Sequence, residues 1–186
     1  MRCKHYYKTF NKNSTVEPTS IKTWKINFAD EYAEWRNKFS FIYHSTRDIK
    51  LRQFSVKLLH RILVTKKELF KFWLADDKAC FFCPNPDSIE HTFLDCIVTQ
   101  SFYSEALIWF NNVNTTDISL SKKQITFNDI PALQQLTDYQ RHRLHSFVIL
   151  LKQYINSCKY LEKKPTLKEF QSKVLLQLQI KKCALP

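Results

Sequence analysis

Four residues with metal-binding side chains follow one another near the middle of the chain, as Cys80-x2-Cys83-x7-His91-x4-Cys96. Two cysteines separated by two residues form a tight turn that brings both thiolates to one cation. His91 and Cys96, with four residues between them on a following helix, are expected to face the same way. Three sulfur ligands and one nitrogen favour Zn²⁺ over magnesium or calcium. Because four protein ligands leave no open position, the spacing predicts a structural zinc site and not a hydrolytic one.

The distribution of charge is the second feature that bears on function. The chain carries a formal net charge of +12. Basic residues dominate 50–78 and 139–186, whereas 79–138, which holds the four ligands, is net acidic. From charge alone, a polyanionic partner and a merely solubilising surface are equally supported.

A helix predicted over 49–64 separates apolar from basic side chains. Its apolar face is expected to comprise Leu51, Phe54, Leu58, Leu59 and Ile62. Beside Gln53, a second stripe comprises Lys50, Lys57, His60 and Arg61. The zinc loop itself is acidic and is poorly suited to phosphate. We therefore expect these four residues to contact RNA or DNA, and the zinc ion to brace the neighbouring helices. Phe81 and Phe82 are expected to cover the apolar core beneath the site rather than to stack on a base.

Hydrophobic periodicity predicts a mainly α protein, an irregular helical domain with one CCHC zinc-knuckle-like site. Helices are expected over 24–41, 49–64, 65–74, 98–110 and 137–160, and from 166 onward. Capping boxes at Thr65, Thr137 and Thr166 begin three of them. The longest is expected to bury Leu144, Phe147, Val148, Leu151, Tyr154, Ile155 and Cys158.

Helix ends need a replacement for glycine, because the chain has none. Positive φ angles are expected at Asn or Asp, and Asn111-Asn112 is predicted to stop the helix over 98–110. Residues 126–131 are predicted to be a turn into a short helix near Pro131. The missing glycine also excludes P-loops, dinucleotide-binding fingerprints and Gly-x-Ser-x-Gly nucleophile elbows.

The expected organisation is an extended arm over 1–23, a zinc-binding domain over 24–112 and a helical region over 113–186. No apolar run is long enough to span a membrane, and the first residues contain no secretory signal. We therefore expect an intracellular, nuclear or cytoplasmic protein that is not secreted and binds no membrane. Its cysteines are expected to be reduced, with Cys3, Cys158 and Cys183 as plain thiols.

A family resemblance rests on several of these residues. They are Leu51-Arg52-Gln53-Phe54-x3-Leu58-Leu59-His60-Arg61-Ile62-Leu63-x-Thr65, Cys80-x2-Cys83, Ile89-Glu90-His91-x-Phe93, Cys96, Trp35, Ile42-Tyr43 and Phe102-Tyr103. Over 24–110 the chain resembles the zinc-binding domain C-terminal to the reverse transcriptase of LINE-type, non-LTR retrotransposons. The resemblance implies a C-terminal fragment of a longer polyprotein that helps to hold template RNA or target DNA during target-primed reverse transcription. The alternative is a structural or protein-interaction domain that packs on the polymerase without touching nucleic acid.

The resemblance does not imply catalysis by this chain. Asp76 and Asp77 imitate the aspartate pair of reverse transcriptases, but such a pair needs a third carboxylate and a β-hairpin to bind two Mg²⁺ ions. Asp87 and Glu162 imitate a nuclease motif, but they are far apart in sequence and Asp87 lies inside the zinc loop. We expect no enzyme and no small-molecule substrate.

Overall fold

The computed structural model describes residues 17–28, 35, 38, 42, 46–128 and 136–183, and over 179–183 only the backbone. The chain divides into two compact units, Met1–Trp35 and Arg36–Pro186. Several predicted features lie outside the described residues: 1–16 of the arm, Tyr32 and Phe39, the short helix near Pro131, and the side chains of Cys3 and Cys183. The larger unit holds parts of both 24–112 and 113–186, and these boundaries stay a prediction.

The smaller unit contains helix α2, Thr19–Phe28. Its first turn is closed by the N–H of Ile21, which donates to the carbonyl of Pro18 at 3.0 Å. The prediction of an extended arm is therefore wrong for 19–23. Polar composition suggested a linker, but Pro18 sits where a helix start tolerates proline, and the polar residues after it continue the helix.

The larger unit is built from helices, which confirms the predicted fold class in the part of the chain that is described. In order they are α4 (Ile49–Leu59), α5 (Lys66–Lys71), a π-helix η1 (His91–Asp95), α6 (Ile97–Asn114), α7 (Lys122–Phe127), α8 (Asp138–Tyr160) and α9 (Leu167–Cys183). The described residues contain one isolated antiparallel β-bridge, between Ala79 and Pro86. That bridge closes the loop that carries Cys80 and Cys83.

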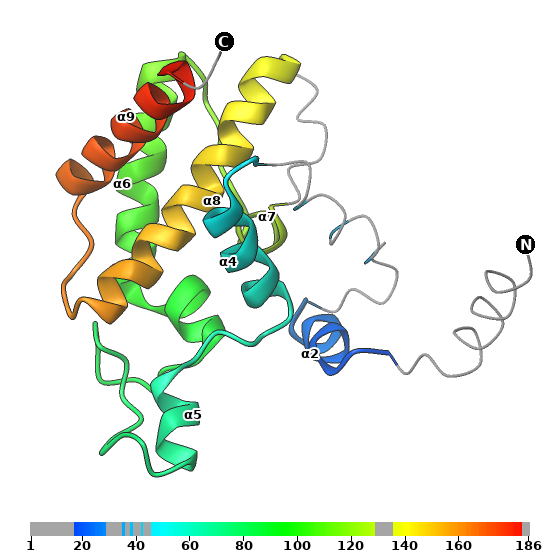
Figure 1. Ribbon diagram of the computed structural model, residues 1–186, viewed down its shortest axis with the longest axis vertical. Helices are drawn as coiled ribbons and strands as arrows, with labels where there is room; N and C mark the ends of the chain where they lie inside the picture. The colour runs from blue at the N-terminus through cyan, green and yellow to red at the C-terminus, as the bar shows by residue number, and fades with distance from the viewer. Residues whose placement is uncertain are drawn as a thin grey trace, which may run out of the picture. The chain divides into compact units, whose positions relative to one another are not determined.

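Helix α8 is the centre of the unit, and α4, α6 and α9 pack against it (Figure 1). Its predicted apolar face is confirmed, since all six residues and Cys158 are buried. An aromatic core forms where α6, α8 and α9 meet, with ring centroids 4.6 to 5.7 Å apart along the chain of contacts. We use the term aromatic core for Phe102, Phe110, Phe147, Tyr154 and Phe170.

Helix starts agree well with the capping motifs in the sequence. Thr65 and Thr137 both form complete capping boxes, as predicted. Before α9, Glu169 instead bonds to the hydroxyl of Tyr154 and the ammonium of Lys163. Helix α7 was not expected over 122–127, so the predicted turn at 126 is wrong. Its start is a further capping box, in which Ser121 pairs with Gln124.

Helix ends agree less well with the predictions. Helix α4 stops at Leu59 and α5 at Lys71, both before the predicted ends, whereas α6 runs past Asn111-Asn112 to Asn114. Because α4 ends early, Ile62 is 61% exposed and not part of the apolar face. Positive φ angles were expected at Asn or Asp. Among the described residues Asn128 agrees with this expectation, whereas Arg61, Trp73, Thr115 and Glu162 do not.

Candidate metal centre

The four predicted ligands come together in space. One donor atom from each of Cys80, Cys83, His91 and Cys96 lies within 4.8 Å of the other three. The Sγ atoms of Cys83 and Cys96 are 3.9 Å apart, and Cys83 Sγ is 3.1 Å from His91 Nε2. Tetrahedral zinc with Zn–S bonds of about 2.3 Å places two sulfur ligands about 3.8 Å apart. The donor set and its spacing therefore fit Zn²⁺.

Backbone hydrogen bonds shape the turn that carries the first two cysteines. The N–H of Cys80 donates to the carbonyl of Asn85 at 2.7 Å, and the N–H of Asp87 donates to the carbonyl of Lys78 at 2.8 Å. Inside this loop the N–H of Phe82 donates to Cys80 Sγ at 3.4 Å. Such a bond favours the thiolate, which is the form that binds a metal. The loop thus holds two sulfur ligands close together, as the Cys-x2-Cys spacing predicts.

A π-helix presents the other two ligands. His91 and Cys96 are five positions apart, which overshoots one turn of an α-helix with 3.6 residues per turn. In η1 the chain widens, and the N–H of Cys96 donates to the carbonyl of His91 at 2.7 Å. This five-residue turn places the two side chains on one face. The expectation that both face the same way is right, but an ordinary helix does not supply the geometry.

Burial makes the Cys80 thiol reluctant to ionise. It raises the pKa of the Cys80 thiol to about 12, and the neighbouring thiols of Cys96 and Cys83 act in the same direction. The N–H of Phe82 opposes this shift. A cation bound at the site replaces these protons, so metal binding and proton release are coupled.

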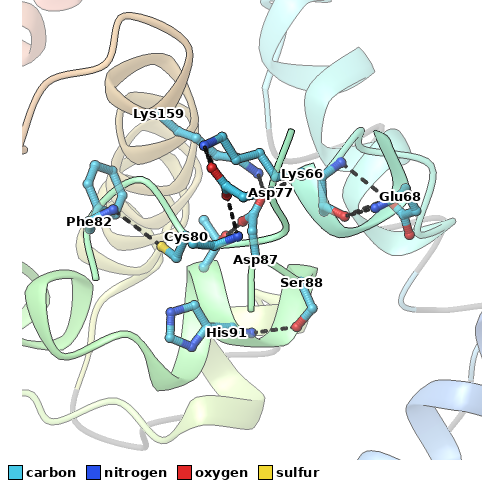
Figure 2. A network of polar contacts seen from close by, with 12 residues as sticks. Lys66, Glu68, Asp77, Cys80, Phe82, Asp87, Ser88, His91 and Lys159 are labelled. Carbon is cyan, nitrogen blue, oxygen red and sulfur yellow. Dashed lines mark hydrogen bonds and ion pairs between the residues drawn. The ribbon is translucent and has the colours of Figure 1, made fainter. Parts of the chain in front are cut away.

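Asp87 ties the zinc loop to two distant helices (Figure 2). Its side chain is fully buried and accepts three bonds: from the backbone N–H of Lys66 at 2.5 Å, from the hydroxyl of Thr92 at 2.6 Å, and from the ammonium of Lys159 at 2.6 Å. The partners belong to the start of α5, to η1 and to the end of α8. In the sequence Asp87 appears only as an acidic residue of the zinc loop and as half of an imitated nuclease motif, and no local signal shows that it is buried.

The other two acidic residues near the ligands are also paired. Glu90 pairs with the guanidinium of Arg61, just past the end of α4. Asp95 pairs with Lys122 at the start of α7, at 2.6 Å and in a largely exposed position. Each acidic residue therefore links the metal-binding segment to a different element, which agrees with the interpretation of the zinc ion as a brace.

The structure separates the four residues that were expected to bind nucleic acid. Lys50, Lys57 and His60 are exposed on one stripe of α4 with Gln53 between them. Arg61 does not continue this stripe, because the helix has ended, its φ is 58° and its side chain is 22% exposed beside Glu90. The opposite face of α4 is buried. We call Lys50, Gln53, Lys57 and His60 the basic stripe.

The two phenylalanines between the first ligands differ in exposure. Phe82 is buried, at 7% exposed, whereas Phe81 is half-buried, and their rings meet edge to face at 5.8 Å. In the same segment Phe93 of η1 meets Phe54 of α4 at 6.1 Å. Phe82 is therefore buried rather than presented to solvent, and its covering of the apolar core stays a prediction.

The comparisons with known proteins bear on this site. A family model described as zinc-binding in reverse transcriptase matches residues 3–103, more than half of the chain. The chain belongs to this family. No curated protein and no solved structure shows significant similarity to it. The matched segment contains all four clustered ligands. Among the described residues, no helix is both long and apolar enough to cross a membrane.

Proposed function

We propose that this chain is a zinc-stabilised nucleic-acid-binding module of a LINE-type retrotransposon reverse transcriptase. In this proposal Cys80, Cys83, His91 and Cys96 bind a structural Zn²⁺ ion, and the basic stripe holds template RNA or target DNA. Membership of the zinc-binding family and the fit of the four donors support the metal. The proposal places the module C-terminal to the polymerase of a longer polyprotein, and assigns it no catalytic role.

The observation that carries the nucleic-acid role is the two-sided character of α4. One face buries Leu51, Phe54, Leu58 and Leu59, which anchors the helix against α8. The other face exposes the basic stripe, whose members recur at helical spacing. A rigid helix with cations on its outer face can follow a phosphate backbone, which supplies most of non-specific affinity. Arg61 is excluded from this surface by its pairing with Glu90.

A specific observation also favours the alternative of a protein-interaction domain. An apolar groove of about 140 Å³ lies between α6, α8 and α9. Leu175 and Leu178 on its rim are 57% and 40% exposed. Such apolar surface is typical of sites where proteins pack together.

A salt titration distinguishes the two functions. The zinc-loaded chain is titrated with a labelled single-stranded RNA and with a DNA duplex at several salt concentrations. Phosphate binding predicts that log K falls with log salt by about 0.7 to 0.9 per contact. Replacing both lysines of the basic stripe, Lys50→Ala with Lys57→Ala, should flatten this slope by about one to two units.

The matched control removes the same charge elsewhere. Lys164→Ala with Lys168→Ala changes two exposed lysines at the start of α9 and should leave the slope unchanged. An equal effect of both double variants would contradict the assignment to α4, because it would show a response to total charge alone. Failure of the wild-type chain to bind any RNA or DNA would favour the protein-interaction function.

A further inference from the structure

The end of α5 exposes an unusual group of apolar side chains. Phe70 is 42% exposed, Phe72 70%, Trp73 91% and Leu74 71%. Single exposed apolar residues are ordinary, but a contiguous group marks a contact surface. We call these four residues the aromatic tip.

The backbone holds the aromatic tip in a specific shape. Trp73 has a φ of 59°, a left-handed conformation that is a clear outlier for a bulky residue. The N–H of Trp73 donates to the carbonyl of Phe70 at 3.2 Å, and the N–H of Leu74 donates to the carbonyl of Leu69 at 2.9 Å. Strained backbone that surrounding bonds maintain is a reason to look for function. Here the strain accompanies the display of a large aromatic ring to solvent.

The zinc loop anchors the base of this segment. The backbone N–H groups of Lys66 and Lys67 both donate to Asp87, at 2.5 Å to its carboxylate and 3.3 Å to its carbonyl. The Lys66 ammonium lies 3.4 Å from the carboxylate of Asp77 at the other end of the segment. Figure 2 shows Lys66, Asp77 and Asp87 in the same network of polar contacts as Cys80 and His91. A tip fixed at both ends loses little conformational freedom when it binds.

The charges around the tip identify the kind of partner. Lys67, Lys71 and Lys78 are exposed, and none of them forms an ion pair within the described ranges. Lysine is depleted in protein–protein interfaces, whereas aromatic rings among cations are typical of surfaces that bind single-stranded nucleic acid. Among the acidic residues of the same segment, Glu68 is already engaged within the protein, because its side chain completes the capping box of Thr65.

We propose that the aromatic tip stacks on unpaired bases of single-stranded nucleic acid, while Lys67, Lys71 and Lys78 contact its phosphates. This inference rests on the proposed function and extends it, because it names single strands as the preferred substrate. Stacking requires a free base face, which a duplex offers only at its ends.

The test compares three ligands with the zinc-loaded full chain: a 15-nucleotide oligo(dT), an abasic strand of the same length, and a duplex. The wild-type chain should bind oligo(dT) more tightly than the other two. Trp73→Leu keeps an apolar side chain but removes the ring, and should weaken oligo(dT) binding by about 5- to 150-fold, equivalent to about 1–3 kcal/mol per stacked base. Trp73→Phe keeps a ring and should retain most of the affinity. Oligo(dT) should also quench tryptophan fluorescence in the wild-type chain and less in Trp73→Phe.

Tyr139→Leu is the matched control, because Tyr139 is 70% exposed at the start of α8, outside the tip. This substitution should leave the affinity for all three nucleic acids unchanged. Equal wild-type binding of all three ligands, with Trp73→Leu unchanged, would overturn the stacking site and leave the basic stripe as a phosphate-binding surface. Loss of oligo(dT) affinity in both Trp73→Leu and Tyr139→Leu would also overturn it. Absence of binding to every ligand would refute both the stacking site and the proposed function.

Discussion

A buried lysine is the most unusual single residue of the larger unit. Lys152 of α8 is 2% exposed, and its ammonium donates to the backbone carbonyl of Thr126 at 3.0 Å. The small cavity beside it is lined otherwise by uncharged side chains of α4, α7 and α8 and by Ile42. Lys38 lies close by, with its ammonium 4.6 Å from the ring centre of Phe127. Burial lowers the pKa of Lys152 to about 7.

This lowered pKa makes the stability of the protein depend on pH. Between about pH 7 and the ordinary lysine value near 10.4, the unfolded chain binds a proton that the folded chain has released. The free energy of unfolding should therefore rise with pH through this interval, by at most about 1.4 kcal/mol per unit from this group. Lys152→Met should flatten the rise. Urea denaturation of the zinc-loaded protein at pH 7, 8 and 9 measures it.

The difference between wild type and variant is the decisive quantity, because other groups titrate in the same interval. Burial raises the pKa of the Cys158 thiol, for example, and this acts in both proteins. An identical pH dependence in Lys152→Met would show that the lysine is not held neutral in the core.

Residue types alone predicted the metal ligands but missed the buried charges. The spacing of Cys80, Cys83, His91 and Cys96 is local information, and the four donors do come together. Asp87 and Lys152 look like surface residues in the sequence. Their burial depends on which helices pack over them, and that is decided by tertiary contacts far away in the chain.

Among elements, the helix ends show how a chain without glycine closes its helices. After α4, α5 and α8 the same pair of backbone bonds recurs, in which a residue with positive φ donates three positions back and the next residue donates five positions back. This is the Schellman arrangement, whose left-handed position normally holds glycine. Here that position is occupied by Arg61, Trp73 and Glu162.

Each such residue carries a backbone cost that substitution can reveal. A left-handed conformation costs a non-glycine residue about 1–2 kcal/mol. The side chain of Arg61 also pairs with Glu90. A change to glycine therefore loses this ion pair but removes the cost of the left-handed backbone conformation. We expect Arg61→Gly to be more stable than Arg61→Ala by about 1 kcal/mol, because both lack the ion pair and only alanine retains the strain. Urea denaturation of both zinc-loaded variants measures the difference.

Equal stability of the two variants would mean that the backbone at this position relaxes without the arginine.

The left-handed residues after α4, α5 and α8 also explain why helix ends were predicted less well than helix starts. The capping boxes at Thr65 and Thr137 are local sequence patterns, and both starts were correct. The stop after α4 depends on Arg61 adopting a conformation that its residue type disfavours, so the sequence carried no comparable signal.

At the scale of the larger unit, packing is organised around two centres. One is the metal centre, with the loop around Cys80 and Cys83 and with η1. The other is the aromatic core between α6, α8 and α9, which contains none of the four ligands. The buried ion pair of Asp87 with Lys159 joins them, as does α6, which begins directly after Cys96.

This division predicts a graded response to removal of the metal. Structural zinc contributes about 10–16 kcal/mol in small modules, as much as the whole stability of an ordinary domain. Chelation should abolish hydrogen-exchange protection over 76–97 and in α5, because Asp87 no longer fixes Lys66 and Lys67. Amides in the middle of α8, near Val148 and Ile155, should remain protected, since their side chains are fully buried.

Two cysteine variants make this prediction specific to the metal. Cys83→Ser removes a ligand and should reproduce the pattern of the chelated protein without any chelator. Cys158→Ala removes a thiol of α8 that is also free of any disulfide and is fully buried, but is not one of the four ligands. This variant should keep the zinc content and the hydrogen-exchange protection over 76–97. Protection lost to the same degree in α8 as in the zinc loop would refute the division into two centres, because the ion would then hold the whole unit together. Unchanged protection over 76–97 after complete metal removal would instead show that packing and the bonds of Asp87 suffice to fold the loop.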